Sequence, residues 1–314
     1  MIKILLDADT GVDDSIALLY ALKNPDVQLV GVTTVLGNTD PVQAAKNSLA
    51  LIALAKPDYE VPVAIGAGQT LKGVVTKSDT HVHGKNGIGD AELPPAEQKP
   101  IERGGVDFMI EQARKYAGEL VIVATGRLTN LALAIQKDAS FVKNVKKAVI
   151  MGGTVFAPGN VSPVAEANIY GDPEAADLVL TSGMDVTIVG LDVTKKTILT
   201  YDDVLKLERH CREENQPIVR YLKDCLGFYM SFYTDTVNTL ESCPMHDPLA
   251  MLVAVNPALV TTRKWKARVE CTDGLCRGMI VTDRREHTFK AEFVEFCIEV
   301  DGDKAVAELL AAFL

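Results

Sequence analysis

The chain opens with the stretch MIKILLDADTGVDD, residues 1–14, in which a mostly apolar run is followed by four aspartates within eight residues. The run 2–6 has the length and composition of a buried strand, and residues 15–23 continue as an apolar helical pattern. The aspartates therefore crowd at the end of a strand, where like charges a few ångströms apart repel one another. Either some of these carboxyl groups are protonated, or a cation holds them together.

The same alternation of short apolar runs and helical patterns continues along the chain. We expect strands at 2–6, 27–35, 119–125, 146–153 and 185–193, and helices at 15–23, 41–56, 129–138 and 172–183. The expected strands are apolar throughout, without period-two alternation, as parallel strands covered on both faces are. The sequence therefore predicts an α/β fold with a doubly wound, mostly parallel sheet flanked by helices.

Two regions depart from this alternation. Residues 66–103 are rich in Gly, Pro and polar side chains, and a segment of this length is usually a lid or binding loop and sometimes an insertion. Residues 201–256 have mostly helical patterns, and 266–285 and 291–300 predict antiparallel strands before a closing helix. Because no linker or repeat separates these parts, we expect a single domain over residues 1–314 with a C-terminal helical and antiparallel hairpin elaboration.

Composition narrows the class of protein. The chain has 314 residues, of which 47% are hydrophobic and 24% charged, and its formal net charge is −10, which disfavours nucleic acid as a partner. No segment approaches the roughly 20 apolar residues of a membrane helix, and the N-terminus lacks a signal-peptide pattern. The six cysteines lack zinc-finger spacing, so we expect thiols in a cytoplasmic protein.

Polar residues follow the carboxyl ends of the expected strands, where open α/β sheets bind their ligands. The four aspartates follow the first strand, Asn38 the second and Thr125 the third, and His246 and Asp247 open another apolar helix. We expect these groups to converge on one edge of the sheet.

Taken singly, several of these residues also have a purely structural interpretation. Asp13 or Asp14 suits a helix cap, and Thr129 with Asn130 is expected to be one. Asn38 and Asn160 follow glycines and suit turns, and His83 alone suits a surface loop. The cluster favours a functional site, because capping explains one aspartate and not four around a glycine turn.

Two enzyme classes fit the opening stretch. In a phosphatase of the haloacid-dehalogenase type the strand would end in D-x-D-x-T, with Asp7 as nucleophile, Asp9 as acid–base group and Mg²⁺ beside them. That class also requires a hydroxyl after a second strand, a downstream lysine and a late acidic pair. The stretches TDRR (282–285) and GDPEAA (171–176) match these requirements poorly.

The second class is supported by motifs over nearly the whole chain. DADTGVDD (7–14) resembles the opening D-x-D-x-G-x-D-D motif of the inosine-uridine family of nucleoside hydrolases. The similarity continues in order through LGN (36–38), HGKNG (83–87), ATGRLTNLALA (124–134), MGG (151–153), GNVSPVAEANIYGDPEAA (159–176) and PMHDPLA (244–250). Each motif alone is weak, and their order and spacing together make the resemblance specific.

The resemblance implies a Ca²⁺ ion held by the carboxylates of Asp9, Asp14 and Asp247 and by the carbonyl of Thr125. These are hard oxygen ligands, which suit Ca²⁺ or Mg²⁺ and not zinc. Asp7 would lie behind the ligands and orient them. By the same resemblance the ribose is bound by Asp13, Asn38, Met151, Asn160, Glu166 and Asn168. The polar members of this set are neutral or acidic, which suits hydroxyl groups and disfavours a phosphate.

The implied reaction is hydrolysis of the N-glycosidic bond of a ribonucleoside to free base and ribose. Asp9 would act as general base on a Ca²⁺-bound water of lowered pKa. His246, with His83 assisting, would supply a proton or hydrogen bond to the departing base. The resemblance further implies a role in nucleoside salvage and a homodimer or homotetramer.

The chain departs from the family pattern at a few positions. It has Thr10 where the family usually has proline, and Ala167 where it usually has phenylalanine. Thr234 and Asn238 stand where some relatives have leaving-group contacts. These departures leave the preferred nucleobase open and keep a third interpretation, a nucleoside-binding protein without catalysis. The intact aspartates and His246 argue against that interpretation.

Overall fold

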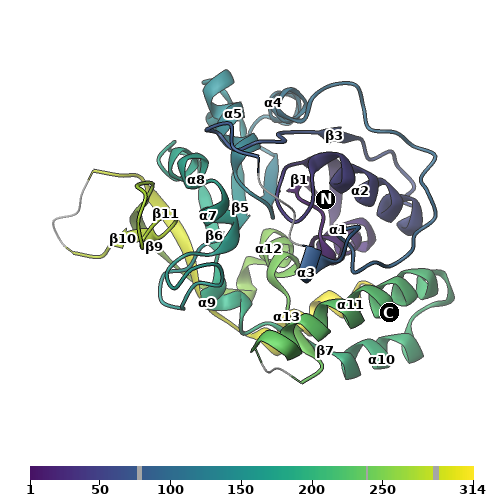
Figure 1. Cartoon of the computed structure of the whole chain (residues 1–314). Coiled ribbons are helices and arrows are strands. Elements are labelled where there is room, and N and C mark those ends of the chain that lie inside the picture. The colour runs from purple at the N-terminus through teal and green to yellow at the C-terminus, as the bar shows by residue number, and fades with distance from the viewer. Residues whose placement is uncertain (76–79, 238–239, 286–289) are drawn as a thin grey trace.

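The computed structural model describes residues 1–75, 80–237, 240–285 and 290–314, and a large sheet lies at its centre (Figure 1). Within the described chain the sheet has nine strands in the order β10-β9-β11-β6-β5-β4-β1-β2-β3. These are β1 (Ile2–Ala8), β2 (Val27–Thr34), β3 (Val63–Ile65), β4 (Val121–Ala124), β5 (Lys147–Met151), β6 (Val186–Val189), β9 (Val260–Val269), β10 (Ile280–Asp283) and β11 (Phe293–Val300). A separate antiparallel pair is formed by β7 (Ile198–Thr200) and β8 (Ser242–Pro244).

Neighbouring strands from β3 to β11 in this order run parallel, and β9 and β10 are antiparallel to their neighbours. The predicted doubly wound, mostly parallel sheet is therefore confirmed, as are the antiparallel strands near the C-terminus. The sequence did not indicate that β11 would join the main sheet beside β6. There Glu295 and Phe296 pair in parallel with Thr187 and Ile188, so the hairpin extends the sheet.

Helices cover both faces of the sheet. One face carries α1 (Val12–Lys23), α2 (Pro41–Ala55), α10 (Tyr201–His210), α11 (Gln216–Val237), α12 (His246–Val255) and α13 (Gly302–Ala311). The other carries α4 (Gly105–Lys115), α5 (Thr129–Lys137), α6 (Phe141–Asn144), α7 (Ala167–Gly171) and α8 (Pro173–Leu180). Two one-turn helices, α3 (Thr80–His83) and α9 (Leu191–Thr194), lie in the connections.

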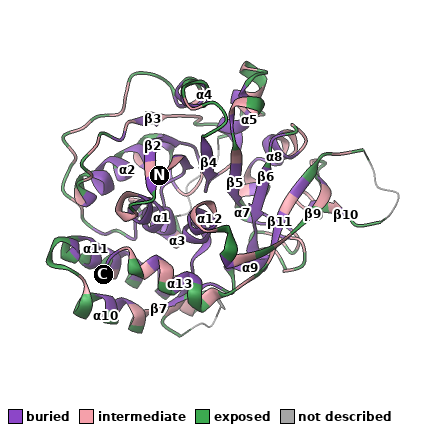
Figure 2. Ribbon diagram, turned by 180° about the vertical axis from the view of Figure 1, so that it is seen from behind, coloured by how far each residue is buried: buried purple, intermediate pink, exposed green. Residues whose placement is uncertain are grey.

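Alternate residues of each central strand enter opposite cores. Ile4 and Leu6 pack with the α1 side, whereas Leu5, between them, packs with the α5 side. Residues in the middle of such a strand are then mostly apolar, because successive side chains point to opposite faces and both faces are covered. Figure 2 shows the result, with the central strands, α1 and α12 largely buried and exposed residues on the outer helices. Apolar runs without alternation are the expected sequence of such strands.

Local sequence explains where several elements begin and end. Asp40 caps α2 by accepting hydrogen bonds from the N–H groups of Val42 and Gln43, and Pro41 occupies the first helical position. The strand predicted at 185–193 was too long, because β6 ends at Val189 and the next residues turn into α9.

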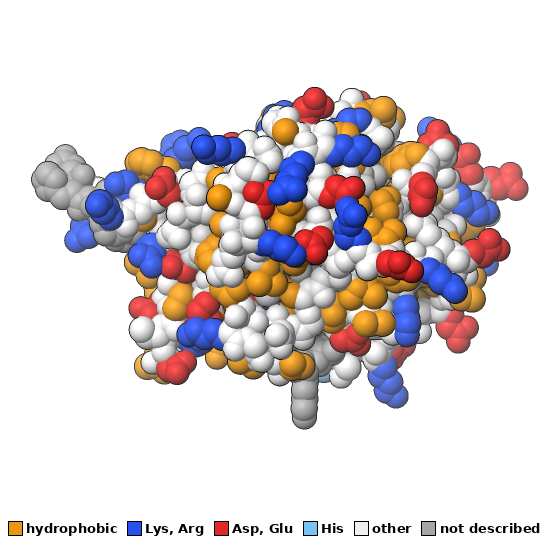
Figure 3. Space-filling model, turned by 90° about the horizontal axis from the view of Figure 1, so that it is seen from above, with side chains coloured by type: hydrophobic (Ala, Val, Ile, Leu, Met, Phe, Trp, Pro, Cys, Tyr) orange, Lys and Arg blue, Asp and Glu red, His pale blue; other side chains and the backbone are white. Residues whose placement is uncertain are grey.

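The surface carries charged side chains of both signs (Figure 3). On the face shown in Figure 3, basic and acidic side chains are interspersed, and neither sign forms a continuous region. Among the helices that the structure describes, none is long and apolar enough to cross a membrane. The six cysteines are free thiols, as expected from their spacing.

Candidate active site

The acidic cluster lies at the point where the strand order reverses. The chain proceeds from β1 outward to β2 and β3 and then returns to the other side of β1 as β4, so the connections after β1 and β4 diverge. Such a switch point leaves a crevice at the carboxyl ends of the strands. Asp9 follows β1, Asn38 follows β2 and Thr125 follows β4, and the structure brings all three side chains together there, as predicted.

Asn38 ties two of the aspartates to each other. Its backbone N–H donates to Asp9 Oδ2 at 2.7 Å, and its side-chain amide donates to Asp9 Oδ1 at 3.2 Å and to Asp14 Oδ2 at 3.1 Å. Asp14 also accepts from the Gly11 N–H at 2.7 Å, which caps α1, and from the Thr125 hydroxyl at 2.6 Å. Capping therefore explains one bond of Asp14, and the remaining bonds hold it against Asp9.

Two glycines make this close approach sterically feasible. A side chain at Gly37 would collide with the Asp9 carboxylate. A Cβ atom at Gly11 would lie 2.6 Å from the Asn38 amide and 2.6 Å from the His83 ring. The glycines in LGN and DADTGVDD are thus required by packing around the site.

A tighter acidic group is formed by Asp13, Asp14 and Asp247, whose carboxylate oxygens lie within 4.8 Å of one another. Asp13 and Asp14 belong to the first turn of α1 and Asp247 to the first turn of α12, where the helix dipole favours negative charge. The predicted ligands Asp14 and Asp247 are therefore neighbours, and Asp13 joins them. Asp9 lies beside this group and contacts Asp14 through Asn38.

Burial and repulsion between neighbouring carboxyl groups disfavour charge on Asp9, Asp13 and Asp247. Loss of hydration, followed by repulsion from Asp14, raises the pKa of Asp13 to about 7. The same two causes raise the pKa of Asp9 well above its usual value. Burial, with repulsion from Asp13, Asp14 and Asp9, does the same to the pKa of Asp247. Within the described chain, Asp13 Oδ1 is buried without a hydrogen-bond partner. Closely spaced buried carboxyl groups and an oxygen without a hydrogen-bond partner are features that suit the binding of a cation.

Asp7 lies behind this cluster and is fully buried. Its Oδ1 accepts hydrogen bonds from the Thr33 hydroxyl at 2.6 Å and from the Asn130 amide at 2.7 Å, and burial raises its pKa to about 7. The predicted cap at Thr129 and Asn130 is wrong, because Leu128 is the cap residue of α5 and makes no side-chain cap bond. The bonds of Asp7 to Thr33 and Asn130 hold it behind the cluster, whereas a phosphatase nucleophile would have to face the substrate.

Three of the residues expected to bind ribose differ in where the structure places them. One of them lies at the ends of central strands, and the other two hold backbone groups around α7. Asn168 donates from its side-chain amide to the Thr125 carbonyl at 2.7 Å and the Met151 carbonyl at 3.2 Å, which places it at the ends of β4 and β5. Glu166 instead caps α7, accepting from the Asn168 and Ile169 N–H groups, and also accepts from Gly153 N–H at 2.8 Å. Asn160 is exposed, and its side-chain oxygen accepts from the N–H of residue 167 at 3.0 Å.

The two predicted histidines are buried beside the acidic cluster, since His83 contacts the backbone of Val12, next to Asp13, and His246 directly precedes Asp247. His83 belongs to α3, and its Nδ1 accepts from the Val12 N–H at 3.2 Å, so the neutral ring carries its proton on Nε2. Burial lowers the pKa of His83 to about 3 and the pKa of His246 to about 4. The burial of His83 argues against its alternative interpretation as a surface-loop residue. Residues 76–79 of the segment expected to act as a lid, and Asn238, lie outside the described residues.

Two tyrosines that sequence reasoning left out of the site connect these histidines. The Tyr233 hydroxyl lies 3.0 Å from His246 Nε2 and 3.4 Å from the Tyr229 hydroxyl. The ring of Tyr229 stacks 5.5 Å from that of His83, and its hydroxyl interacts with Asp13. The i, i+4 spacing of the tyrosines on an amphipathic helix was the available signal, since it places both on one face.

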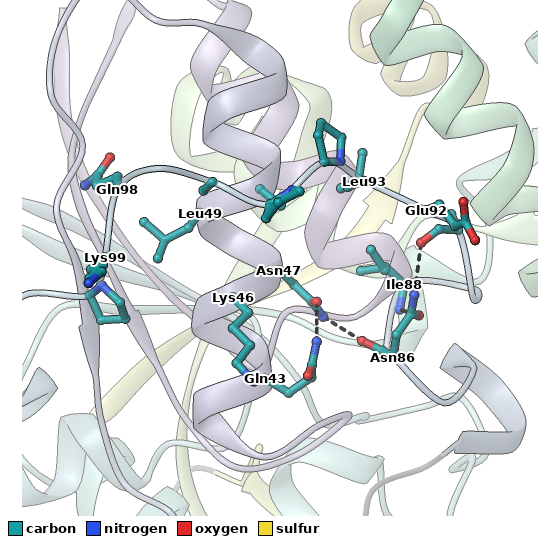
Figure 4. A pocket seen from close by; sticks show the side chains of 16 residues that line it. Gln43, Lys46, Asn47, Leu49, Asn86, Ile88, Glu92, Leu93, Gln98 and Lys99 are labelled. Atoms are coloured by element: carbon teal, nitrogen blue, oxygen red, sulfur yellow. Dashed lines mark hydrogen bonds between the residues drawn. The ribbon is translucent and has the colours of Figure 1, made fainter.

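A pocket of about 560 Å³ lies next to this site, between α2 and the segment 86–100 (Figure 4). Its lining includes Asn47, whose amide donates to the Thr10 carbonyl at 3.1 Å and to the Asn86 carbonyl at 2.9 Å. Asn47 thus joins the aspartate turn to the HGKNG segment that carries His83. The pocket itself contains none of the predicted site residues.

Comparison with known proteins gives one consistent family. A family model described as inosine-uridine preferring nucleoside hydrolase matches residues 4–307. Uridine nucleosidase 1 of Arabidopsis thaliana is 44% identical over 90% of this chain and 82% of its own length. A plant nucleoside hydrolase has a TM-score of 0.93 at 32% identity, with 99% of this chain and 98% of that chain covered.

A purine-preferring ribonucleoside hydrolase from Gardnerella vaginalis has a TM-score of 0.92 at 36% identity, again over 99% of this chain and 98% of that chain. Sequence family, sequence relatives and three-dimensional neighbours agree over nearly the full length. The chain belongs to the inosine-uridine preferring nucleoside hydrolase family.

Proposed function

We propose that the protein hydrolyses the N-glycosidic bond of ribonucleosides, releasing the free base and ribose. The observation that carries this proposal is the juxtaposition of a buried acidic cluster with a buried histidine–tyrosine cluster, linked through Asp13 and Tyr229. Cleavage of this bond requires negative groups near the positive charge that develops on the sugar and donors near the departing base. The two clusters supply these groups next to each other, in contact through Asp13 and Tyr229.

We propose that the acidic side binds Ca²⁺. Asp13, Asp14 and Asp247 each present one oxygen within 4.8 Å of the others, and Asp9 lies beside them. The Thr125 carbonyl, which accepts a hydrogen bond from the Asn168 amide, follows β4 at the same edge of the sheet. An all-oxygen set suits a hard cation, and a bound cation would offset the repulsion that raises the pKa values of Asp9, Asp13 and Asp247. When bound, Ca²⁺ would lower the pKa of a coordinated water and so favour its deprotonation.

The chain's own groups have distinct tasks in this proposal. Asp9, held by two hydrogen bonds from Asn38, accepts the proton of the attacking water as general base. Asp7 holds the end of β1 in place through Thr33 and Asn130. His246 and His83, neutral and buried, direct N–H donors toward the base as the bond breaks.

The ribose side depends on Asp13, Asn38 and Asn168, the members of the predicted set that lie at the ends of β1, β2 and β4. These groups can accept hydrogen bonds from the ribose hydroxyls or donate hydrogen bonds to them, and none of these groups is basic. A nucleoside therefore fits the site better than a nucleotide, whose phosphate would meet carboxylates.

We infer that uridine is among the substrates, because the Arabidopsis thaliana relative at 44% identity is named a uridine nucleosidase. The Gardnerella vaginalis relative at 36% identity is described as purine-preferring, so inosine is the informative competitor. Both compounds share the ribose, so a difference in their rates arises from the base and from the groups that contact it.

The test is product analysis with the purified protein. It is incubated with Ca²⁺ and uridine, inosine, 2′-deoxyuridine or a nitrophenyl phosphate, and base, free sugar and phosphate are quantified. We expect base and ribose in equal amounts from a ribonucleoside and no phosphate release. Phosphate release without ribose would favour the phosphatase interpretation. Nucleoside binding without any product would favour a binding protein, and either result would overturn the proposal.

A further inference from the structure

The short helix α9 places a threonine against one of the site histidines. Thr194 is completely buried, and its hydroxyl oxygen lies 2.7 Å from His246 Nδ1. The other ring nitrogen of His246, Nε2, lies 3.0 Å from the Tyr233 hydroxyl, on the side of the site. Thr194 is the last residue of α9, which follows β6, and it belongs to none of the motifs that carried the family resemblance.

The direction of this hydrogen bond follows from the surroundings of the hydroxyl. Among the described residues, Nδ1 of His246 is the one partner of the Thr194 hydroxyl. If Nδ1 carried the ring proton, the hydroxyl would accept that proton, and its own hydrogen would be buried without an acceptor. An unsatisfied buried donor costs about 1–3 kcal/mol. The favourable arrangement has Thr194 donating to Nδ1, which leaves the proton of the neutral ring on Nε2.

We propose that Thr194 is a positioning residue that fixes the tautomer of His246, so that the ring N–H is on Nε2 and directed toward Tyr233 and the departing base. The effect of Thr194 on the rate of hydrolysis rests on the proposed function, whereas the tautomer of His246 does not. In the opposite tautomer the N–H would point at α9, and an unprotonated Nε2 would face the base without a hydrogen to donate.

The chain offers a close set of variants. Thr194→Val removes the hydroxyl and keeps the shape, and Thr194→Ser keeps the hydroxyl. Thr197→Val is the matched control, because Thr197 is also fully buried but its hydroxyl donates to the Val193 carbonyl at 3.3 Å. Thermal unfolding of all three variants establishes that they are folded before any comparison.

The first measurement is independent of activity. The five histidines are labelled with ¹⁵N, and long-range ¹H–¹⁵N spectra at neutral pH report which ring nitrogen carries hydrogen. The His246 signals are identified by their loss in His246→Gln. We expect a protonated Nε2 in wild type, Thr194→Ser and Thr197→Val, and a mixed or reversed tautomer in Thr194→Val. A protonated Nδ1 in wild type would overturn the proposal even if no variant folds.

The second measurement is kinetic. We expect Thr194→Val to lower kcat for uridine by roughly 10–100-fold, as losing an orienting hydrogen bond commonly does, with little change in KM. With an activated nitrophenyl riboside, whose nitrophenolate leaves without a proton donor, kcat should fall much less. Thr194→Ser should keep the wild-type kcat for both substrates. Equal losses on the two substrates would contradict the positioning role. If wild type itself cleaves no nucleoside, the proposed function fails, while the spectra still decide the tautomer.

Discussion

Asn130, in the first turn of α5, donates a 2.7 Å hydrogen bond to the carboxylate of Asp7, at the end of β1 and 123 residues away in the chain. The same amide group donates to the Thr34 carbonyl at 2.9 Å, and its oxygen accepts from the Ala67 N–H at 2.9 Å. One buried side chain therefore connects the ends of β1 and β2 to the loop that follows β3, beside the acidic cluster.

Replacing Asn130 should destabilise the protein more than replacing a typical asparagine. Asn130→Ala leaves a buried carboxylate oxygen, a carbonyl and an N–H with one partner fewer each, at about 1–3 kcal/mol per unsatisfied group. We expect the free energy of unfolding, measured by urea denaturation, to fall by about 2–4 kcal/mol. Asn144→Ala is the control, since Asn144 bonds an exposed serine, and it should change stability by less than about 0.5 kcal/mol.

Asn130 also shows where sequence reasoning reaches its limit. Thr129 and Asn130 precede an apolar run, which is the local pattern of a helix cap. The structure uses them differently, because Thr129 bonds Asp172 at 2.6 Å and Asn130 bonds Asp7. A partner more than a hundred residues away leaves no trace in a local pattern. Tyr229 and Tyr233 were missed for the same reason, since their contact with His246 depends on how α11 and α12 pack.

The central sheet was predictable because burial on both faces makes each parallel strand apolar throughout. The acidic cluster was predictable because carboxyl ends of parallel strands share one edge. The position of β11 in the sheet was not predictable, because its sequence fits an antiparallel partner and a parallel partner equally. The structure gives it one of each, β9 and β6.

The junction of β11 with the main sheet leads to a prediction about acid stability. Glu295 accepts hydrogen bonds from Lys147 on β5, Thr187 on β6 and Thr262 on β9. Burial acts to raise the pKa of Glu295, but the Lys147 bond and the two hydroxyls outweigh it and lower the pKa from 4.5 to about 2. A lowered pKa stabilises the fold above pH 4.5, and this contribution is lost as the pH falls toward 2.

We therefore expect Glu295→Gln to be less stable than wild type at pH 7 and the difference to shrink steadily below about pH 4.5. Urea denaturation at a series of pH values measures this difference in the free energy of unfolding. Glu299→Gln, an exposed position on the same strand, should show no such trend. A difference between wild type and Glu295→Gln that stays constant from pH 7 to pH 3 would mean that shape, and not charge, accounts for the loss.

The proposed general base gives a prediction about rate. Asp9→Asn should lower kcat by roughly 10²–10⁴-fold, the usual loss when general-base catalysis is removed. Asp7→Asn should reduce kcat less, because Asp7 is fully buried and its bonds go to Thr33 and Asn130. Steady-state rates of ribose release from one nucleoside show which of the two variants loses more activity. A nearly normal Asp9→Asn beside an inactive Asp7→Asn would refute the assignment.

The acidic cluster gives a prediction that links metal, pH and stability. Burial and the charge of Asp14 raise the pKa of Asp13 from 3.8 to about 7, so the metal-free fold prefers the protonated carboxyl group. That preference stabilises the fold at low pH and is lost as the pH rises through 7. Ca²⁺ that binds only the folded state adds about 2.7 kcal/mol at a hundred times its dissociation constant. The melting temperature with chelator should therefore fall between pH 5 and pH 8, and Ca²⁺ should raise it more at pH 8.

Removing one member of the cluster should weaken this response. Asp247→Asn takes away one of the three carboxylates that lie within 4.8 Å of one another, and with it part of the repulsion. Its melting temperature with chelator should then depend less on pH, and Ca²⁺ should raise it less than in wild type. Asp26→Asn, an exposed substitution at the start of β2, should keep the full wild-type response. If Asp247→Asn and wild type melt alike with Ca²⁺ and with chelator at both pH values, Asp247 is not a ligand, and the carboxylates brought together from α1 and α12 do not form a calcium site.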